Sequence, residues 1–196
     1  MSSLNFGLNW FDFLVAVAVL AGVNLGNKRG MSKEVIVFLQ WCAIVVIAAL
    51  FYAPVGQLLS MWTGVGEMIG YVIAYLLLAG AVKLVFSKIN QRVGDKIEMR
   101  HPFGRMEYYL GPLAGGVRFA CIILLTMALL HAGRQTAAHN DRDVKKQKDI
   151  YGEVYFPTIG MICQDVFNKS ASGKFVVNNL SFLLITPAWQ RQAKAD

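Results

Sequence analysis

Four apolar stretches, each close to the length of one membrane crossing, dominate the first two thirds of the chain. They run from Trp10 to Gly26, from Val35 to Ala53, from Gly64 to Phe86 and from Tyr108 to Leu130. A hydrocarbon core about 30 Å thick is crossed by roughly 20 helical residues. The composition agrees, because 56% of the residues are hydrophobic and 16% are charged, against about 45–50% and 25% in soluble domains. We therefore predict an all-α membrane protein with four transmembrane helices.

A short basic segment between the first two stretches indicates a sharp turn at a membrane surface. Within GNKRGMSKEVIVFLQW, residues 26–41, the cations are Lys28, Arg29 and Lys33. Backbone groups cannot stay unpaired in lipid, so a turn between two spans lies in the interface or in water, where cations are favoured. Gly30 permits a tight reversal, and Glu34 complements the N-terminus of the next helix. The segment predicts a helical hairpin.

The distribution of basic residues predicts the orientation. Connections 27–33 and 87–107 contain Lys and Arg, whereas residues 1–9 and 54–66 contain neither. The positive-inside rule then places the first and third connections in the cytoplasm and both termini outside. The tail beyond Leu130 opposes this orientation, because it is also rich in Lys and Arg, but long segments often cross the membrane regardless of their charge.

Glycines recur at a spacing of four in three of the spans. The pairs are Gly22 with Gly26, Gly66 with Gly70, and Gly111 with Gly115. Such pairs let two helix backbones approach closely, although glycine is common in membrane helices and any single pair can be incidental. We predict helix packing at the first two pairs.

The fourth stretch contains an arginine and several residues that favour a break. The twelve residues from Phe119 to Leu130 make about 18 Å of helix, which is too short to cross. The span must therefore include Gly111 and Pro112, and Arg118 then lies roughly 15 Å along it. A mid-membrane arginine costs about 2.5–3.5 kcal/mol, so it should snorkel, pair or face a hydrated cavity. The Gly-Pro and Gly-Gly steps predict a broken fourth span, which protein or water must cover.

Few acidic residues can pair with Arg118. Glu34 is the predicted partner within the chain, because it belongs to the same side of the membrane. Glu107 precedes Arg118 by eleven residues and could reach it only through a broken helix or a second copy. Asp12 and Glu67 belong to the opposite side, where we expect them to be solvated.

Two spaced patterns resemble those of the colicin V production protein family. The first is an acid in the first span followed by R-G-x-x-x-E, and it comprises Asp12, Arg29, Gly30 and Glu34. The second is an acid followed by glycines and an arginine, and it comprises Glu107, Gly111, Gly115 and Arg118. Glu107 replaces the more usual aspartate, and Phe119 stands where the family commonly has glycine. The resemblance covers residues 9–131.

This resemblance implies a multi-pass protein of the bacterial inner membrane, associated with colicin V production or export and with envelope homeostasis. We divide the chain into a transmembrane domain, residues 1–131, and a C-terminal polar stalk with an amphipathic or cap segment, residues 132–196. The apolar block in the tail can lie on the membrane, pack onto a partner or cap the bundle. Its large side chains are Phe175, Phe182, Leu183, Leu184 and Trp189.

No pattern of an enzyme active site or ligand site is present. The three histidines, His101, His131 and His139, do not have metal-ligand spacing. There is no phosphate loop, zinc motif or dinucleotide fingerprint. The net charge of +7 is not arranged as a basic face with interleaved aromatics, which nucleic-acid binding needs. We expect no catalytic residue, cofactor, metal or nucleic-acid partner.

Two functions fit this sequence. In the first, the protein is a non-enzymatic assembly factor or scaffold for other membrane proteins. In the second, it forms an oligomeric channel or transport component with a hydrated path near Arg118. Both functions place the chain in a lipid bilayer with copies of itself, other membrane proteins, or both as partners.

Overall fold

Helices make up every regular element in the described part of this computed structural model, which comprises residues 9–64, 66–100, 106–133, 145 and 159–186. The long helices are α1 (Trp10–Arg29), α2 (Met31–Thr63), α3 (Glu67–Arg100) and α4 (Glu107–Ala132). The short ones are α6 (Ile159–Gln164), the π-helix η2 (Asp165–Lys169), α7 (Ala171–Asn179) and the 3-10 turn η3 (Ser181–Leu183). Four helices are long and apolar enough to cross a membrane. The predicted all-α fold with four spans is confirmed.

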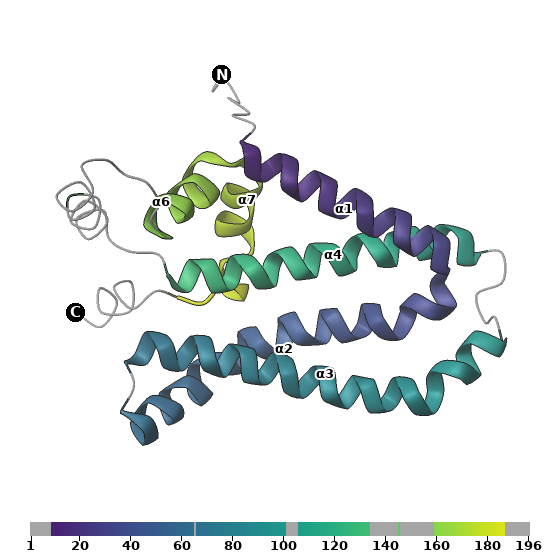
Figure 1. Ribbon diagram of the computed structural model, residues 1–196, viewed down its shortest axis with the longest axis horizontal. Helices are drawn as coiled ribbons and strands as arrows, with labels where there is room; N and C mark the ends of the chain where they lie inside the picture. Colours follow the sequence, from purple (N-terminus) through teal and green to yellow (C-terminus); the bar gives the residue numbers. More distant parts are fainter. Residues whose placement is uncertain (1–8, 65, 101–105, 134–144, 146–158, 187–196) are drawn as a thin grey trace.

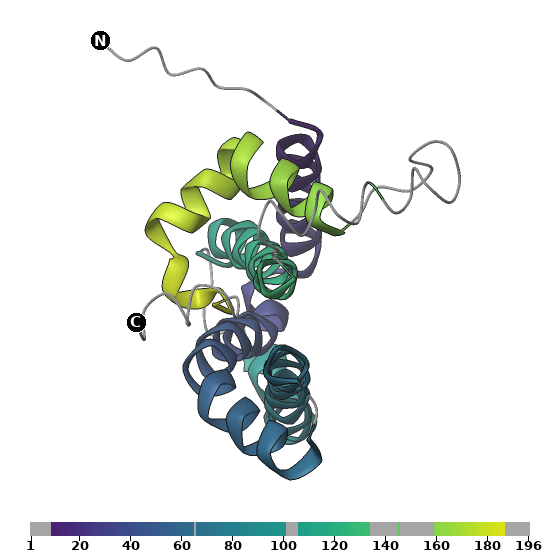
Figure 2. The same cartoon turned by 90° about the vertical axis from the view of Figure 1, so that its left-hand side faces the viewer.

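The four long helices form an open row in the order α1, α4, α2, α3 (Figures 1 and 2). α4 packs between α1 and α2, and the other side of α2 packs against α3. Apolar residues are spread around the whole circumference of α1 and α2, as expected for helices that face lipid as well as protein. We call the end of the row that holds the α1–α2 turn the turn end, and the opposite end, where α6 to η3 lie, the cap end.

α2 is longer than the sequence predicted. Its apolar stretch was expected to end at Ala53, but the helix continues through Pro54 to Thr63, where Gly64 ends it with a left-handed φ of 67°. A proline removes one backbone hydrogen bond, and the chain resumes the helix because lipid offers the remaining backbone groups no other partner. The part of α2 beyond this point, blue at the lower left of Figure 1, runs at an angle to the rest.

The fourth span is one uninterrupted helix, so the predicted break is wrong. α4 contains Pro112 as an internal residue. The proline lies early in the helix and leaves only the Tyr108 carbonyl without its usual donor. Gly111 and Gly115 pack directly on the backbone of α1, so the surrounding protein supports the helix where its intrinsic propensity is lowest.

The described part of the tail covers the cap end. α7 contacts α1, η3 contacts α2, and the short elements pack on one another. Leu184 and Ile185 are buried in the hydrophobic core together with side chains from α2, α3 and α4. Phe175 and Phe182 are exposed, so they are free to face lipid. Trp189 lies outside the described residues.

Candidate functional site

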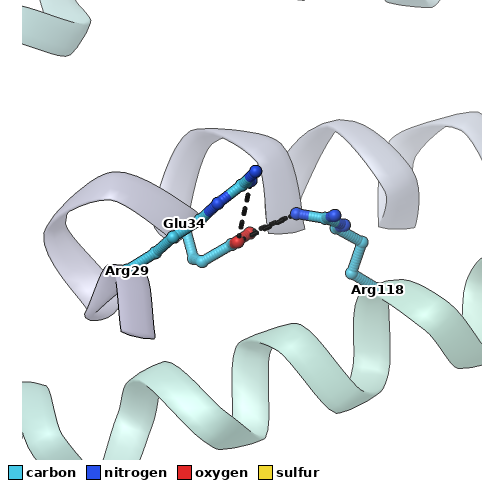
Figure 3. A network of polar contacts seen from close by, with 3 residues as sticks. All are labelled: Arg29, Glu34 and Arg118. Atoms are coloured by element: carbon cyan, nitrogen blue, oxygen red, sulfur yellow. Dashed lines mark hydrogen bonds and ion pairs between the residues drawn. The ribbon is translucent and has the colours of Figure 1, made fainter. Parts of the chain in front are cut away.

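A buried carboxylate between two arginines is the most highly charged feature of the turn end (Figure 3). Glu34, in the first turn of α2, has a fully buried side chain. Nη1 of Arg118 donates to both of its carboxylate oxygens at 2.8 Å. Nη1 of Arg29 donates to Oε1 at 3.3 Å. The side chain of Arg118 is 13% exposed and that of Arg29 is 49% exposed, so the shorter pair is also the more buried one.

The register of the helices explains how Arg118 reaches Glu34. The α1–α2 turn lies level with Gly111, because a Cβ on Gly111 would come within 3.1 Å of the Gly30 Cα. Arg118 follows seven residues later, which places its Cα about 10 Å deeper than the turn. Side chains on a helix lean toward its N-terminus, which for α4 is the turn end. Arg118 therefore extends back to Glu34, and the predicted pairing of these two residues is confirmed.

Backbone contact between α1 and α4 places the arginine opposite the turn. A Cβ on Gly22 would lie 2.6 Å from the Gly115 carbonyl oxygen, and a Cβ on Gly26 would collide with the Gly111 carbonyl. The two helices can be this close only because all four positions lack a side chain. The packing predicted for Gly22 and Gly26 is therefore present.

The second predicted glycine pair is only half correct. A Cβ on Gly70 would lie 2.8 Å from the carbonyl oxygen of Gly56 in α2, so Gly70 is at a helix contact. Gly66 precedes α3, and a Cβ there would meet no atom within 4 Å. The spacing of four between Gly66 and Gly70 wrongly predicted that both lie on one helix face, because α3 begins only at Glu67. Sequence reasoning also missed Gly56, which lies beyond the expected end of the second span.

Asp12 is buried at the cap end. The prediction that it is solvated is therefore wrong. Its carboxylate accepts hydrogen bonds from the backbone N–H of Ala171 at 3.0 Å and of Ser172 at 2.8 Å. The Ser172 hydroxyl donates to it at 2.6 Å, and the Asn9 N–H at 3.0 Å. A negative charge is stabilised where it meets the free N–H groups and dipole of a helix N-terminus. Asp12 thus attaches α7 to α1 across about 160 residues of sequence.

The other two acidic residues behave differently. Glu67 is exposed in the first turn of α3, as predicted. Glu107 is the first residue of α4, and its side chain lies outside what the structure describes. The motif residues are therefore divided: Arg29, Gly30, Glu34, Gly111, Gly115 and Arg118 meet at the turn end, and Asp12 lies at the cap end.

Two further polar contacts at the cap end fasten the end of the described chain. The Thr186 N–H donates to the Tyr52 hydroxyl at 3.2 Å. Nδ1 of His131 lies 2.8 Å from the Ile185 carbonyl oxygen, and the same ring meets Phe167 edge to face. Sequence reasoning did not single out these residues for pairing, because each contact joins segments more than fifty positions apart.

Comparison with known protein families gives a match. The sequence model of the family described as colicin V production protein matches residues 11–144, which include Asp12, the turn and the whole of α4. The chain belongs to the colicin V production protein family. No curated protein and no solved structure matches the chain. In this colicin V production family member, the cap formed by α6 to η3 lies beyond the matched region. The turn-end cluster lies wholly inside it.

Proposed function

We propose that this colicin V production family member is a non-enzymatic scaffold of the bacterial inner membrane, which assembles other membrane proteins for toxin production or export or for envelope homeostasis. The open row of helices is the observation that carries the proposal. In the most apolar window of each span, only 22% to 33% of the residues are buried within the chain. Most of each span is thus available to lipid, to other membrane proteins or to further copies.

The turn-end cluster supports a structural role for the charged residues. One arginine and one glutamate neutralise each other inside the protein, and removing one partner of a buried pair leaves an uncompensated charge. The cluster thereby fixes α4 against the α1–α2 turn. Four glycines already pack within the chain and are not available to a partner: Gly22, Gly26, Gly111 and Gly115. Partners would therefore dock on the apolar outer faces of α1 and α3, the two helices at the edges of the row.

The positive-inside rule supports an orientation with the turn end in the cytoplasm and both termini outside. Lys28 is exposed at the turn, and Lys88 is exposed near the same end of α3. The test uses a membrane-impermeant maleimide on intact cells that carry either Thr63→Cys or Lys88→Cys, both at exposed positions. We expect labelling at position 63 and none at position 88. The reverse pattern would invert the orientation.

Photocrosslinking tests the scaffold proposal directly. A photoreactive amino acid is placed at Leu84 on α3 or at Leu20 on α1, whose exposed fractions are 70% and 66%. Ala48 of α2 has no exposed surface, and it serves as the control position. We expect a heterologous membrane protein crosslinked from one of the two edges and none from position 48. Recovery of homo-oligomers alone, from both edges and in repeated experiments, would contradict the scaffold function.

One observation favours the channel as the second candidate. Within the described residues, Nε and Nη2 of Arg118 have no hydrogen-bond partner, because Glu34 bonds to Nη1 alone. These donors could meet water or a second copy of the chain. A channel predicts ion or solute flux through liposomes that contain the purified protein, and a change in that flux in Arg118→Lys. Absence of flux from folded oligomers would remove this candidate.

A further inference from the structure

We propose that the cavity between α1, α4 and α7 binds one acyl chain of a membrane phospholipid, with α7 as its lid. The cavity has a volume of about 440 Å³. Its principal lining residues are Val15 and Val19 of α1, Ala120 and Leu124 of α4, and Phe175 and Val176 of α7. This inference does not depend on whether the protein is a scaffold or a channel.

The cavity results from the way α1 and α4 pack. The two backbones touch at Gly22 and Gly115 and diverge toward the cap end, as Figure 1 shows. Toward the cap end, the facing positions carry larger apolar side chains, among them Val15 and Val19 on α1 and Leu124 on α4. α7 lies across this opening. The result is an open apolar groove between α1 and α4 that α7 borders at the cap end.

The chemistry of the lining selects the occupant. Nearly all the lining side chains are aliphatic or aromatic, and a water needs two to four polar partners to be stable in a buried site. Ser172 is the polar side chain of the lining, and its hydroxyl already donates to Asp12. An empty apolar space forfeits dispersion contacts. The volume falls within the roughly 300–1,000 Å³ typical of small-ligand sites.

The position of the cavity selects the source of this apolar ligand. Its walls are two helices that are long and apolar enough to span a membrane, so hydrocarbon is the medium beside it. A phospholipid tail is flexible, apolar and present at the highest local concentration. Phe175 at the edge of α7 is 60% exposed, so lid and lipid can meet without burying a polar group.

Binding at this site is coupled to the docking of the tail. The acyl chain would contact α7 and the two spans at once, so it would bind the docked state of α7 better than the undocked state. A ligand that prefers one state shifts the equilibrium toward it. Asp12 fixes the N-terminus of the same helix. Lipid occupancy and the Asp12 contact should therefore support each other.

The test uses the full-length protein in nanodiscs that contain phosphatidylethanolamine with a diazirine on one acyl chain. After irradiation, mass spectrometry locates the lipid adducts. Ala120→Phe fills the cavity, and Ala81→Phe makes the same change on an exposed position of α3. We expect adducts on the lining residues, reduced about tenfold by Ala120→Phe, because displacing two methylene groups from an apolar site lowers affinity by about this factor. Ala81→Phe should leave them unchanged.

Two further variants test the same site: Val19→Phe, which also fills the cavity, and Asp12→Asn, which weakens the attachment of α7. Val19→Phe should act as Ala120→Phe does, which covers the case in which Ala120→Phe does not fold. Asp12→Asn should reduce the same adducts by releasing the lid. Lining adducts no more frequent than those on exposed α3, and unaffected by either filling variant, would overturn the proposal.

Discussion

The two ends of the α1–α4 pair each bury a carboxylate, but different groups satisfy it. At the turn end, Glu34 bonds to the charged guanidinium of Arg118. At the cap end, Asp12 accepts hydrogen bonds from neutral backbone N–H groups and one hydroxyl. Removing the first acid leaves a largely buried cation without its counter-charge, whereas removing the second leaves polar groups without an acceptor. We infer that the turn end holds the spans together and that the cap end holds the tail to them.

Glu34→Ala should have the largest effect and tests the turn end. Breaking a buried ion pair by removing one partner costs about 3–5 kcal/mol, so we expect a strongly reduced folded yield and a lower thermal midpoint in detergent. Glu67→Ala removes an exposed acid from the first turn of α3 and should have little effect.

The double variant Glu34→Leu/Arg118→Leu sharpens the same comparison. Replacing both members of a buried pair with apolar residues is often neutral or stabilising. The double variant should therefore melt above both Glu34→Leu and Arg118→Leu. Additive losses in the double variant would show that the two side chains do not compensate each other.

Gly26→Ala should have the next largest effect, because the new Cβ would collide with the backbone of α4. Overpacking of this kind costs about 1–3 kcal/mol. Gly80→Ala provides the matched control, since a Cβ at Gly80 in α3 would meet nothing within 4 Å. We expect a lower thermal midpoint for the first variant and an unchanged or slightly higher one for the second. Equal midpoints would contradict the close contact of α1 with α4.

Asp12→Asn tests the cap end and should have a smaller, local effect. Asparagine keeps one acceptor oxygen but lacks the negative charge and the second acceptor, so the variant loses only part of the roughly 0.5–2 kcal/mol that a complete helix cap contributes. Hydrogen exchange should speed up in residues 171–180 and stay unchanged in α2 and α3. Asp165→Asn is the control, because that side chain forms an exposed ion pair with Lys169. Loss of protection across all four spans would show that Asp12 supports the membrane domain as well as the tail.

Arg29→Ala should have the smallest effect of the series. Its side chain is about half exposed and lies 3.3 Å from Glu34, and exposed ion pairs contribute about 0–1 kcal/mol. The thermal midpoint should fall by much less than in Arg118→Ala. A comparable fall in both variants would mean that Glu34 depends on the two arginines equally.

The family match also separates the two ends. It covers residues 11–144, so it contains every partner in the turn-end cluster. At the cap end it contains Asp12 but not the helix that Asp12 binds. A residue within the matched region thus has its partners in a segment beyond it, which explains why the motif alone did not indicate what this acid contacts.

Several features could be predicted because local rules govern them. The sharp turn at Gly30 followed from its basic residues and glycine, but α1 packs mainly on α4, and α2 packs on α3 and α4, so α1 and α2 do not form the predicted hairpin. The pairing of Arg118 with Glu34 followed from the small number of acids on the same side of the membrane. The break in α4 was wrong, because propensity at Gly111 and Pro112 was judged without the α1 backbone that packs on them. Asp12 was placed in water because nothing near it in the sequence could bury it.

The sequence by itself determined the solvent of this protein, the number of its crossings and the ends at which its charges lie. These properties depend on the length of each apolar stretch and on the free-energy cost of placing charges and unpaired backbone N–H and C=O groups in lipid. Both factors act on each segment separately. Only the tertiary structure decided that the helices form an open row, that α4 stays intact and that Asp12 holds α7. Those outcomes depend on contacts between distant segments, and lipid exerts little hydrophobic preference among alternative helix arrangements.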